Sequence, residues 1–277
     1  MFKIKKYIPD IVVAIILIAG IGLLAYPTIG DYINALHSSK AIGSYVEKTK
    51  DLSKEEKENL LREAREYNES LVGKVNRYYL NEEEKKRYAH ILDITKTGIM
   101  AYVEIPKLNI YMPVYHGTDE GVLQIAAGHL PGSSLPVGGE NTHSLISGHR
   151  GLPSAKLFTD IDKLKKGDLF FIHVFDEVLA YKVNQIKIVL PDDVETLEIE
   201  KGKDYVTLIT CTPYGVNSHR LLVRGERTVY KQSESKIEDM IKKNNLKYIM
   251  LTAGVILALI GMTVLSIARM RQRRTAV

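Results

Sequence analysis

Thr207-Leu208-Ile209-Thr210-Cys211 is the stretch around which this chain is organised, because it brings the only cysteine of 277 residues to the end of a predicted strand. From Asp204 to Thr210 most residues are β-branched, aromatic or leucine, which favours a strand. Pro213 follows and cannot donate to a strand ladder, so the strand should stop just past Cys211. Free cysteines are usually buried packing residues. The neighbours of Cys211 therefore decide whether it is a nucleophile.

Short alternating runs separated by Gly and Pro surround this stretch and predict a mainly β domain at residues 98–230. The predicted strands are Ile99–Ile105, Asn109–Val114, Leu145–Ser147, Leu169–Phe175, Leu179–Val189, Tyr205–Thr210 and Leu221–Val229. Few helical patterns lie between them. Strands at this spacing indicate a closed or nearly closed β-barrel.

Two further residues are expected at the same end of the barrel as the cysteine. His149 follows the run that ends at Ser147, so it also lies at a strand end. After the turn that begins at Cys211, a strand resumes near Arg220. If these strands are neighbours, Arg220 lies beside Cys211, whereas Arg224, on the same face, is about 13 Å further along.

A thiolate, an imidazole and a guanidinium together suit acyl transfer. Cys211 would attack a carbonyl carbon, His149 would protonate the leaving amine and later deprotonate the incoming nucleophile, and Arg220 would stabilise the oxyanion. A papain-like hydrolase conflicts with the strand before Cys211, since its cysteine is carried by a helix. His129 and His143 lie near a loop rich in Gly and Pro, but a second pair of ligands at metal spacing is absent, so no metal or other cofactor is predicted.

Two uncharged apolar segments are each long enough to span a membrane: Ile11–Gly30 with 20 residues and Tyr248–Ala268 with 21. A cleaved signal peptide is the alternative for the first, but signal cores usually have only ~7 to 15 residues. Basic residues precede the first segment and follow the second, which places both tails in the cytoplasm and the middle of the chain outside. The net charge of +5 therefore requires no nucleic-acid partner.

The remaining regions follow from these boundaries. Residues 1–30 form the cytoplasmic tail and first span, residues 231–247 a linker, residues 248–268 the second span and residues 269–277 a basic tail. Residues 31–97 should be mostly helical: Ser53 and Glu56 form a capping box, and Leu60, Ala64, Tyr67 and Leu71 form one apolar stripe.

The ordered motifs of the domain resemble those of the sortases. Thr207–Cys211 matches the T-L-x-T-C signature of that family. The segments that resemble the class C, pilus-assembling branch are Tyr115–Thr118, Gly128–Gly139, Thr142–His143, Gly148–Pro153 and Cys211–Gly225. The resemblance covers about residues 99–227.

This resemblance implies a sortase-type β-barrel with N-terminal helices and a transmembrane helix at each end. It implies Cys211 as nucleophile, His149 as general acid and base, Arg220 as the group that holds the substrate carbonyl, and Thr210 as a residue lining the groove. The implied substrates are surface proteins with a Leu-Pro-x-Thr-Gly-like sorting signal, cleaved after Thr through a thioester. In class C the acceptor is typically a pilin lysine.

One departure from class C concerns the lid. Class C enzymes commonly carry an Asp-Pro-aromatic lid over the cysteine, and no such tripeptide occurs in this chain. Either Tyr78 or Tyr79 covers the groove by other contacts or the site is open, and we expect the open site.

Two alternative functions stay open. One is attachment of proteins to cell-wall peptidoglycan, and the other is a non-catalytic membrane-tethered scaffold that binds sorting signals.

Overall fold

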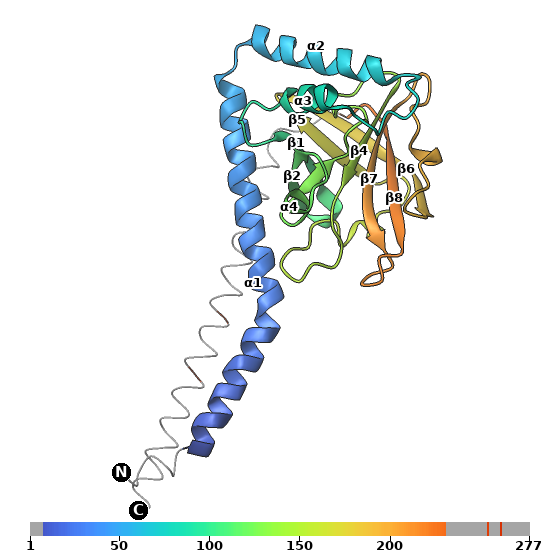
Figure 1. The fold of residues 1–277 in the computed structure, drawn as a ribbon. Helices are drawn as coiled ribbons and strands as arrows, with labels where there is room; N and C mark the ends of the chain where they lie inside the picture. The colour runs from blue at the N-terminus through green and yellow to red at the C-terminus, as the bar shows by residue number, and fades with distance from the viewer. Residues whose placement is uncertain (1–7, 231–253, 255–260, 262–277) are drawn as a thin grey trace, which may run out of the picture. The chain divides into compact units, whose positions relative to one another are not determined.

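The computed structural model describes residues 8–230 together with the isolated residues 254 and 261 (Figure 1). Its strands are β1 (Ile99–Ile105), β2 (Ile110–His116), β3 (Ala127–His129), β4 (Thr142–Ser147), β5 (Leu169–Val174), β6 (Glu177–Val189), β7 (Asp204–Thr212) and β8 (His219–Arg227). Its α-helices are α1 (Ile8–Asp51), α2 (Lys54–Leu71), α3 (Glu82–His90) and α4 (Glu120–Leu123). Three short 3₁₀ turns are η2 (Pro106–Leu108), η3 (Ile161–Lys163) and η4 (Glu195–Leu197).

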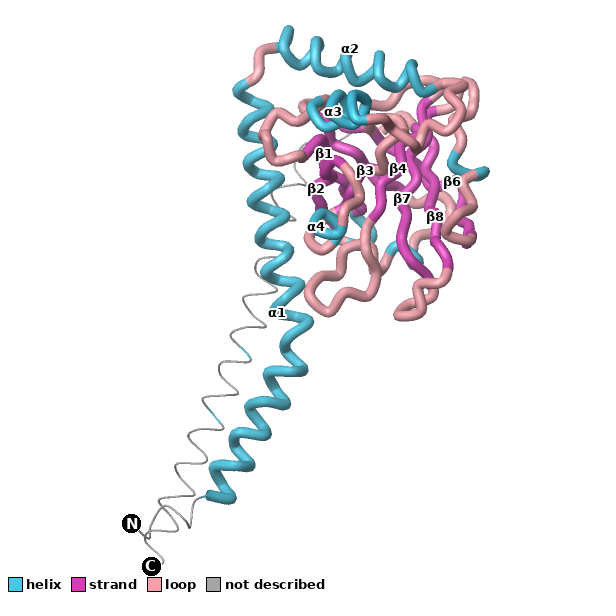
Figure 2. The backbone as a smooth tube through the Cα atoms, viewed as in Figure 1, coloured by secondary structure: helices cyan, strands magenta, loops and turns pink. Residues whose placement is uncertain are grey.

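The strands close into a barrel in the order β1-β2-β3-β4-β7-β8-β6-β5, so the predicted β-barrel is confirmed (Figure 2). Two neighbours matter for the site: β7 pairs in parallel with β4 and antiparallel with β8. Because parallel partners run in the same direction, the C-terminal ends of β4 and β7 meet at one end of the barrel, where β8 begins.

The seven predicted strands are all present, and their bounds differ by a few residues. β3 was missed because it has three residues, one of them Gly128, which is too short for an alternation pattern. β7 ends at Thr212, just past Cys211, as the sequence predicts. The direction of the Cys211 side chain therefore follows from the alternation of side chains between the two faces of β7.

That alternation divides β7 and β8 between two environments. Val206, Leu208, Leu221 and Val223 belong to the main core, which fills the barrel. Ile209, Leu222 and their neighbours on the opposite face form a separate apolar cluster outside the barrel. Side chains alternate along a strand, so Cys211 shares the outer face with Ile209.

α1 is one continuous helix across the predicted boundary between residues 30 and 31. Its second half is fixed to the barrel by Tyr45, whose hydroxyl donates to Met100 O (3.1 Å) and accepts from Phe175 N (3.0 Å). Tyr45 is fully buried and stacks on Phe175. This helix and the barrel therefore share one core.

α2 begins with the predicted capping box at Ser53 and Glu56, and α3 with a second one at Asn81 and Glu84. The predicted stripe buries Ala64, Tyr67 and Leu71, while Leu60 is only partly buried. Asn68 of α2 holds the backbone of Leu135, donating to its O (3.1 Å) and accepting from its N (2.6 Å). The helical region thus packs on the loop between β3 and β4.

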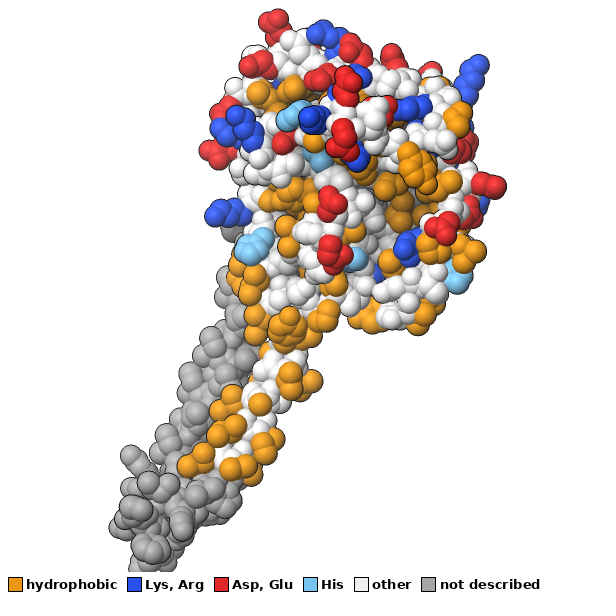
Figure 3. Space-filling model, viewed as in Figure 1, with side chains coloured by type: hydrophobic (Ala, Val, Ile, Leu, Met, Phe, Trp, Pro, Cys, Tyr) orange, Lys and Arg blue, Asp and Glu red, His pale blue; other side chains and the backbone are white. Residues whose placement is uncertain are grey.

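Within the described part of the chain, one helix is long and apolar enough to cross a membrane. The candidate segment begins at Ile11 in α1, with a mean hydropathy of 2.4 in its most apolar window and none of that window buried. On the face drawn in Figure 3, hydrophobic side chains follow the part of α1 that leaves the domain. The predicted second span at 248–268 lies outside the described residues apart from the isolated residues 254 and 261, and the linker at 231–247, the tail at 269–277 and residues 1–7 lie outside them entirely.

Candidate active site

The three predicted site residues lie at one end of three adjacent strands. Cys211 of β7 is paired in register with Arg220 of β8. On the other side of β7, Ile209 is paired with Ser147, the last residue of β4, and His149 follows two residues later. The cysteine is therefore flanked by the histidine's strand and the arginine's strand.

Backbone contacts hold the histidine segment against the cysteine strand. Gly148 N donates to Ile209 O (3.0 Å), and the Thr210 hydroxyl donates to Gly148 O (2.7 Å). A Cβ on Gly148 would lie 2.7 Å from the Phe158 ring, so this position needs a glycine. Thr210 is 1% exposed and faces away from the outer groove. Its side chain positions Gly148, next to His149, instead of lining the groove as expected.

Cys211 is a free, partly exposed thiol. The Nε2 atom of His149 is buried and has no hydrogen-bond partner among the described residues. Its nearest charged partner is Glu120 Oε2 of α4 at 3.6 Å, on a side chain that is 72% exposed. A buried polar atom without a hydrogen-bond partner requires an explanation, and a catalytic role is one such explanation. No sequence pattern indicates Glu120, because it is distant from His149 along the chain and lies on a single helical turn.

Arg220 is held by the turn that joins β7 and β8. Its Nη1 donates to Asn217 O and to His219 O, both at 3.2 Å. A guanidinium carries five N–H donors in a fixed plane, so further donors can hold a substrate oxygen beside Cys211.

An apolar floor leads along the outer face of the barrel to this site. Its buried members are Leu145, Leu197, Ile209 and Leu222, against which Tyr78, Leu130 and Val189 pack. Ile209 lies two residues before Cys211, or about 7 Å along the strand. An extended apolar segment bound on this floor would bring a neighbouring carbonyl to the thiol.

Comparison with known proteins agrees with this geometry. Residues 103–228 match the sortase domain family model. The crystal structure of sortase C1 from Streptococcus agalactiae is 49% identical, covers 69% of this chain and 100% of that chain, and has a TM-score of 0.68. The sortase C structure from Streptococcus pneumoniae is 47% identical over 70% of this chain and 99% of that chain, with a TM-score of 0.63.

The chain belongs to the sortase family. Among curated relatives, sortase A of Bacillus anthracis is 31% identical over 133 residues, which is 48% of this chain and 61% of that protein. Matches to the sortase A of Streptococcus agalactiae and the sortase D of Bacillus subtilis likewise span 61% and 62% of those proteins. The chain thus matches about three fifths of the length of these curated relatives.

Tyr78 lies on the apolar floor of this sortase, although the Asp-Pro-aromatic motif is missing. Its hydroxyl accepts from Arg77 Nη2 (2.7 Å), which also donates to Leu197 O (2.7 Å). The Arg77 backbone fits against Gly132, where a Cβ would lie 2.1 Å from Arg77 O. Tyr79, in contrast, is 84% exposed. The site is therefore partly covered: Cys211 is accessible, whereas Tyr78 occupies the floor that leads to it.

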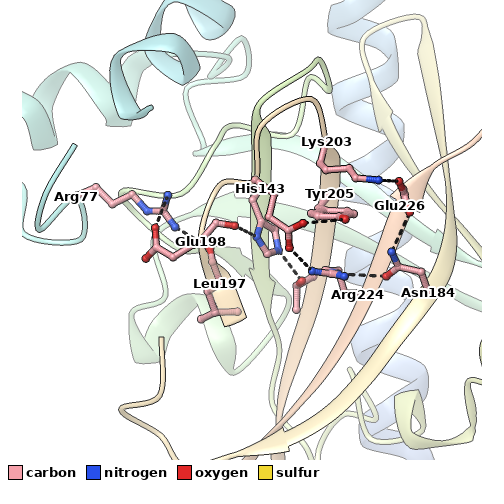
Figure 4. A network of polar contacts seen from close by, with 11 residues as sticks. Arg77, His143, Asn184, Leu197, Glu198, Lys203, Tyr205, Arg224 and Glu226 are labelled. Atoms are coloured by element: carbon pink, nitrogen blue, oxygen red, sulfur yellow. Dashed lines mark hydrogen bonds and ion pairs between the residues drawn. The ribbon is translucent and has the colours of Figure 1, made fainter. Parts of the chain in front are cut away.

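A polar network lies at the other end of the same face (Figure 4). Arg224 donates to Glu200 Oε1 (3.0 Å) and stacks over Tyr205, and Thr207 is its partner in register. Arg224 therefore stabilises the strands at a distance from the thiol, as its position in the sequence predicts.

The two histidines considered as metal ligands are buried and hydrogen-bonded. His143 contacts Glu198 O through Nδ1 (2.9 Å) and the Thr207 hydroxyl through Nε2 (2.7 Å), and burial lowers its pKa to about 4. His129 contacts the Tyr88 hydroxyl (2.9 Å) and Ser134 O (2.8 Å), and burial lowers its pKa to about 3. Both rings serve as neutral parts of the loop packing.

Proposed function

We propose that this chain is a membrane-anchored cysteine transpeptidase that joins pilin subunits into covalent polymers. The observation that carries the proposal is the placement of Cys211 between the His149 segment and Arg220 on three adjacent strands. Sortase membership supports the chemistry, and similarity to sortase C structures supports the pilin substrate. One of those structures is described as giving insight into pilin substrate specificity in Streptococcus pneumoniae.

The first half of the reaction forms an acyl-enzyme. The apolar floor binds the Leu-Pro part of a Leu-Pro-x-Thr-Gly-like signal, and Arg220 holds the Thr carbonyl oxygen. The Cys211 thiolate attacks that carbonyl carbon, and Arg220 stabilises the negative charge that develops on the oxygen. His149 gives its proton to the glycine amine as the Thr–Gly bond breaks, which leaves a thioester on Cys211.

The second half transfers the acyl group to an amine. His149, now neutral, removes a proton from a lysine amine of another pilin as that nitrogen attacks the thioester. The carbon–sulfur bond breaks, the thiolate is regenerated, and an isopeptide bond joins the two subunits. No cofactor takes part in this scheme.

The test uses the full chain in detergent with a sorting-signal peptide and purified pilins. The expected results are a mass increase on Cys211 equal to the peptide up to its Thr, and a ladder of covalent pilin multimers. Cys211→Ala should give neither product. An unmodified Cys211 under conditions that trap thioesters would support the non-catalytic scaffold, and a single adduct with a small wall-type amine but no ladder would support cell-wall anchoring.

The proposed location is the cell membrane, with residues 11–30 and 248–268 as spans and the catalytic domain outside. The apolar segment of α1 supports the first span. Because Cys211 is the only cysteine, a membrane-impermeant thiol reagent added to intact cells reports its side directly. Labelling of Cys211 only after lysis would place the domain inside and contradict this topology.

A further inference from the structure

The chain between His149 and Phe158 forms a closed loop, here called the histidine loop (residues 150–157). Its base is joined by a hydrogen bond from Phe158 N to His149 O (3.1 Å). Leu152 and Ala155 form an isolated bridge near its tip. Because the hydrogen bond at the base and the bridge near the tip close the loop, a displacement of the tip should also displace the backbone of His149.

The tip of the histidine loop lies against α1, about 125 residues away in the sequence (Figure 1). Lys156 N donates to Asp31 Oδ1 (2.9 Å). Next to it, the backbone of Gly30 approaches Ser154 so closely that a Cβ on Gly30 would lie 2.9 Å from Ser154 O and 3.0 Å from its Cα. Gly30 is the last residue of the uncharged apolar segment.

We propose that Gly30 and Asp31 form a positioning contact for His149, through which the anchor helix orients the general acid and base. The imidazole Nε2 has no hydrogen-bond partner among the described residues, and Glu120, 3.6 Å away, is an exposed side chain, so the orientation of the ring depends mainly on its backbone. That backbone is held on one side by Thr210 through Gly148 O and on the other by the histidine loop. The contact with α1 holds the tip of this loop, while the bonds of Arg150 to Thr212 and Asp162 hold its first residue.

The expected effect on rate rests on the proposed function. The contact with α1 should affect kcat but not KM. The apolar floor is built by β4, β7, β8 and the loop of Leu197, and not by the histidine loop. Loss of the α1 contact should therefore lower kcat while the KM for a sorting-signal peptide stays unchanged. Misplacing a catalytic group by about 1 Å can cost up to about 100-fold in rate, and we expect a loss of about tenfold.

Gly30→Ala tests the close approach, and Gly43→Ala in the same helix is its matched control. Alanine favours a helix more than glycine does, so neither change should weaken α1. A Cβ on Gly43 meets no atom of the described residues within 4 Å, whereas one on Gly30 displaces Ser154. We expect kcat to fall about tenfold in Gly30→Ala and to stay unchanged in Gly43→Ala. Equal kcat values in the two variants would overturn the role of Gly30.

Asp31→Ala and Asp31→Asn test the hydrogen bond. Asparagine keeps an oxygen that accepts from Lys156 N, while alanine does not. We expect Asp31→Ala to lower kcat and Asp31→Asn to restore it. If both variants lower kcat equally, or if KM rises in step with the loss of kcat, the contact does not position His149.

Hydrogen exchange in the full chain tests the contact without any substrate. The amides of residues 150–158 should exchange faster in Asp31→Ala and Gly30→Ala than in Asp31→Asn and Gly43→Ala. Unchanged exchange in all four variants would overturn the positioning contact even in an active enzyme. Faster exchange in a chain that forms no acyl-enzyme would instead uphold the contact and refute the proposed function.

Discussion

At Thr210 a single hydroxyl connects the strand of the nucleophile to the backbone beside His149. Thr210→Val keeps the shape of the side chain but leaves Gly148 O without its donor. A buried polar group left unpaired costs about 1–3 kcal/mol, so we expect a loss of about 1–2 kcal/mol in the free energy of unfolding. The kcat should fall about tenfold as the His149 backbone shifts. Urea unfolding and steady-state kinetics measure both.

Thr210→Ser is the matched control, because it keeps the hydroxyl and removes only a methyl group. It should retain most of the activity of the unmodified chain. A Thr210→Val enzyme with unchanged kcat would show that the hydrogen bond to Gly148 has no part in positioning.

Arg220 presents a planar set of donors next to Cys211, and its geometry matters beyond its charge. Arg220→Lys keeps the charge but loses the fork that holds a carbonyl oxygen. We expect kcat/KM for a sorting-signal peptide to fall about 100-fold, the usual effect of losing an oxyanion donor.

The rate at which Cys211 reacts with a small thiol reagent separates the two roles of Arg220. Reagents of this kind form no oxyanion, so labelling of Arg220→Lys should proceed as in the unmodified chain. If the rate of Cys211 labelling falls together with kcat/KM in Arg220→Lys, the role of Arg220 is to activate the thiol and not to stabilise the oxyanion.

At the scale of elements, the segment before α3 provides two adjacent tyrosines with opposite environments. Tyr78 packs on the apolar floor, and Tyr79 is exposed. Tyr78→Ala should uncover the floor and raise the rate of Cys211 acylation by a sorting-signal peptide at least about fivefold, equivalent to about 1 kcal/mol. Labelling by a small thiol reagent should change little, because Cys211 is already partly exposed.

Tyr79→Ala is the control for this experiment and should leave both rates unchanged. Acylation that is equally fast in the two variants and the unmodified chain would mean that peptides bind without displacing Tyr78.

The elements differ in how far the sequence predicts them. Alternation and Gly or Pro breaks predict the longer strands, and two strand ends suffice to bring His149 and Arg220 to Cys211. The continuity of α1 could not be predicted, because Pro27 and Gly30 resemble a helix end while the helix continues through both. The contact of Glu120 with His149, and the choice of Tyr78 over Tyr79 as the residue on the apolar floor, depend on tertiary packing that the local sequence does not indicate.

For the whole molecule, two buried neutral histidines contribute to the loss of stability in acid. The pKa is lowered from 6.5 to about 3 in His129 and to about 4 in His143, in both cases mainly by burial. In the folded protein these rings stay neutral as the pH falls below 6.5, whereas in the unfolded chain they take up protons. Their contribution to stability is therefore complete above about pH 6.5 and is lost as the pH falls toward 4.

Below about pH 6.5, where the rings are neutral in the folded protein but protonated in the unfolded chain, each lowers the free energy of unfolding by up to about 1.4 kcal/mol for every unit that the pH falls. Denaturant unfolding of the full chain in detergent at pH 7.5, 6.5 and 5.5 measures this slope. His143→Gln, which can donate to Glu198 O and accept from Thr207, should reduce the proton uptake on unfolding by about one. A slope unaffected by this substitution would assign the acid response to other groups.

The two attachments of α1 also hold this helix and the barrel rigidly together. Asp31 contacts the histidine loop and Tyr45 contacts Met100, and these two residues, 14 positions apart in the helix, are separated by about 21 Å along its axis. In the proposed topology, with residues 11–30 in a bilayer, this helix would hold the barrel at a fixed distance from the membrane. We therefore expect a sorting signal to be cleaved only when it is presented at that distance.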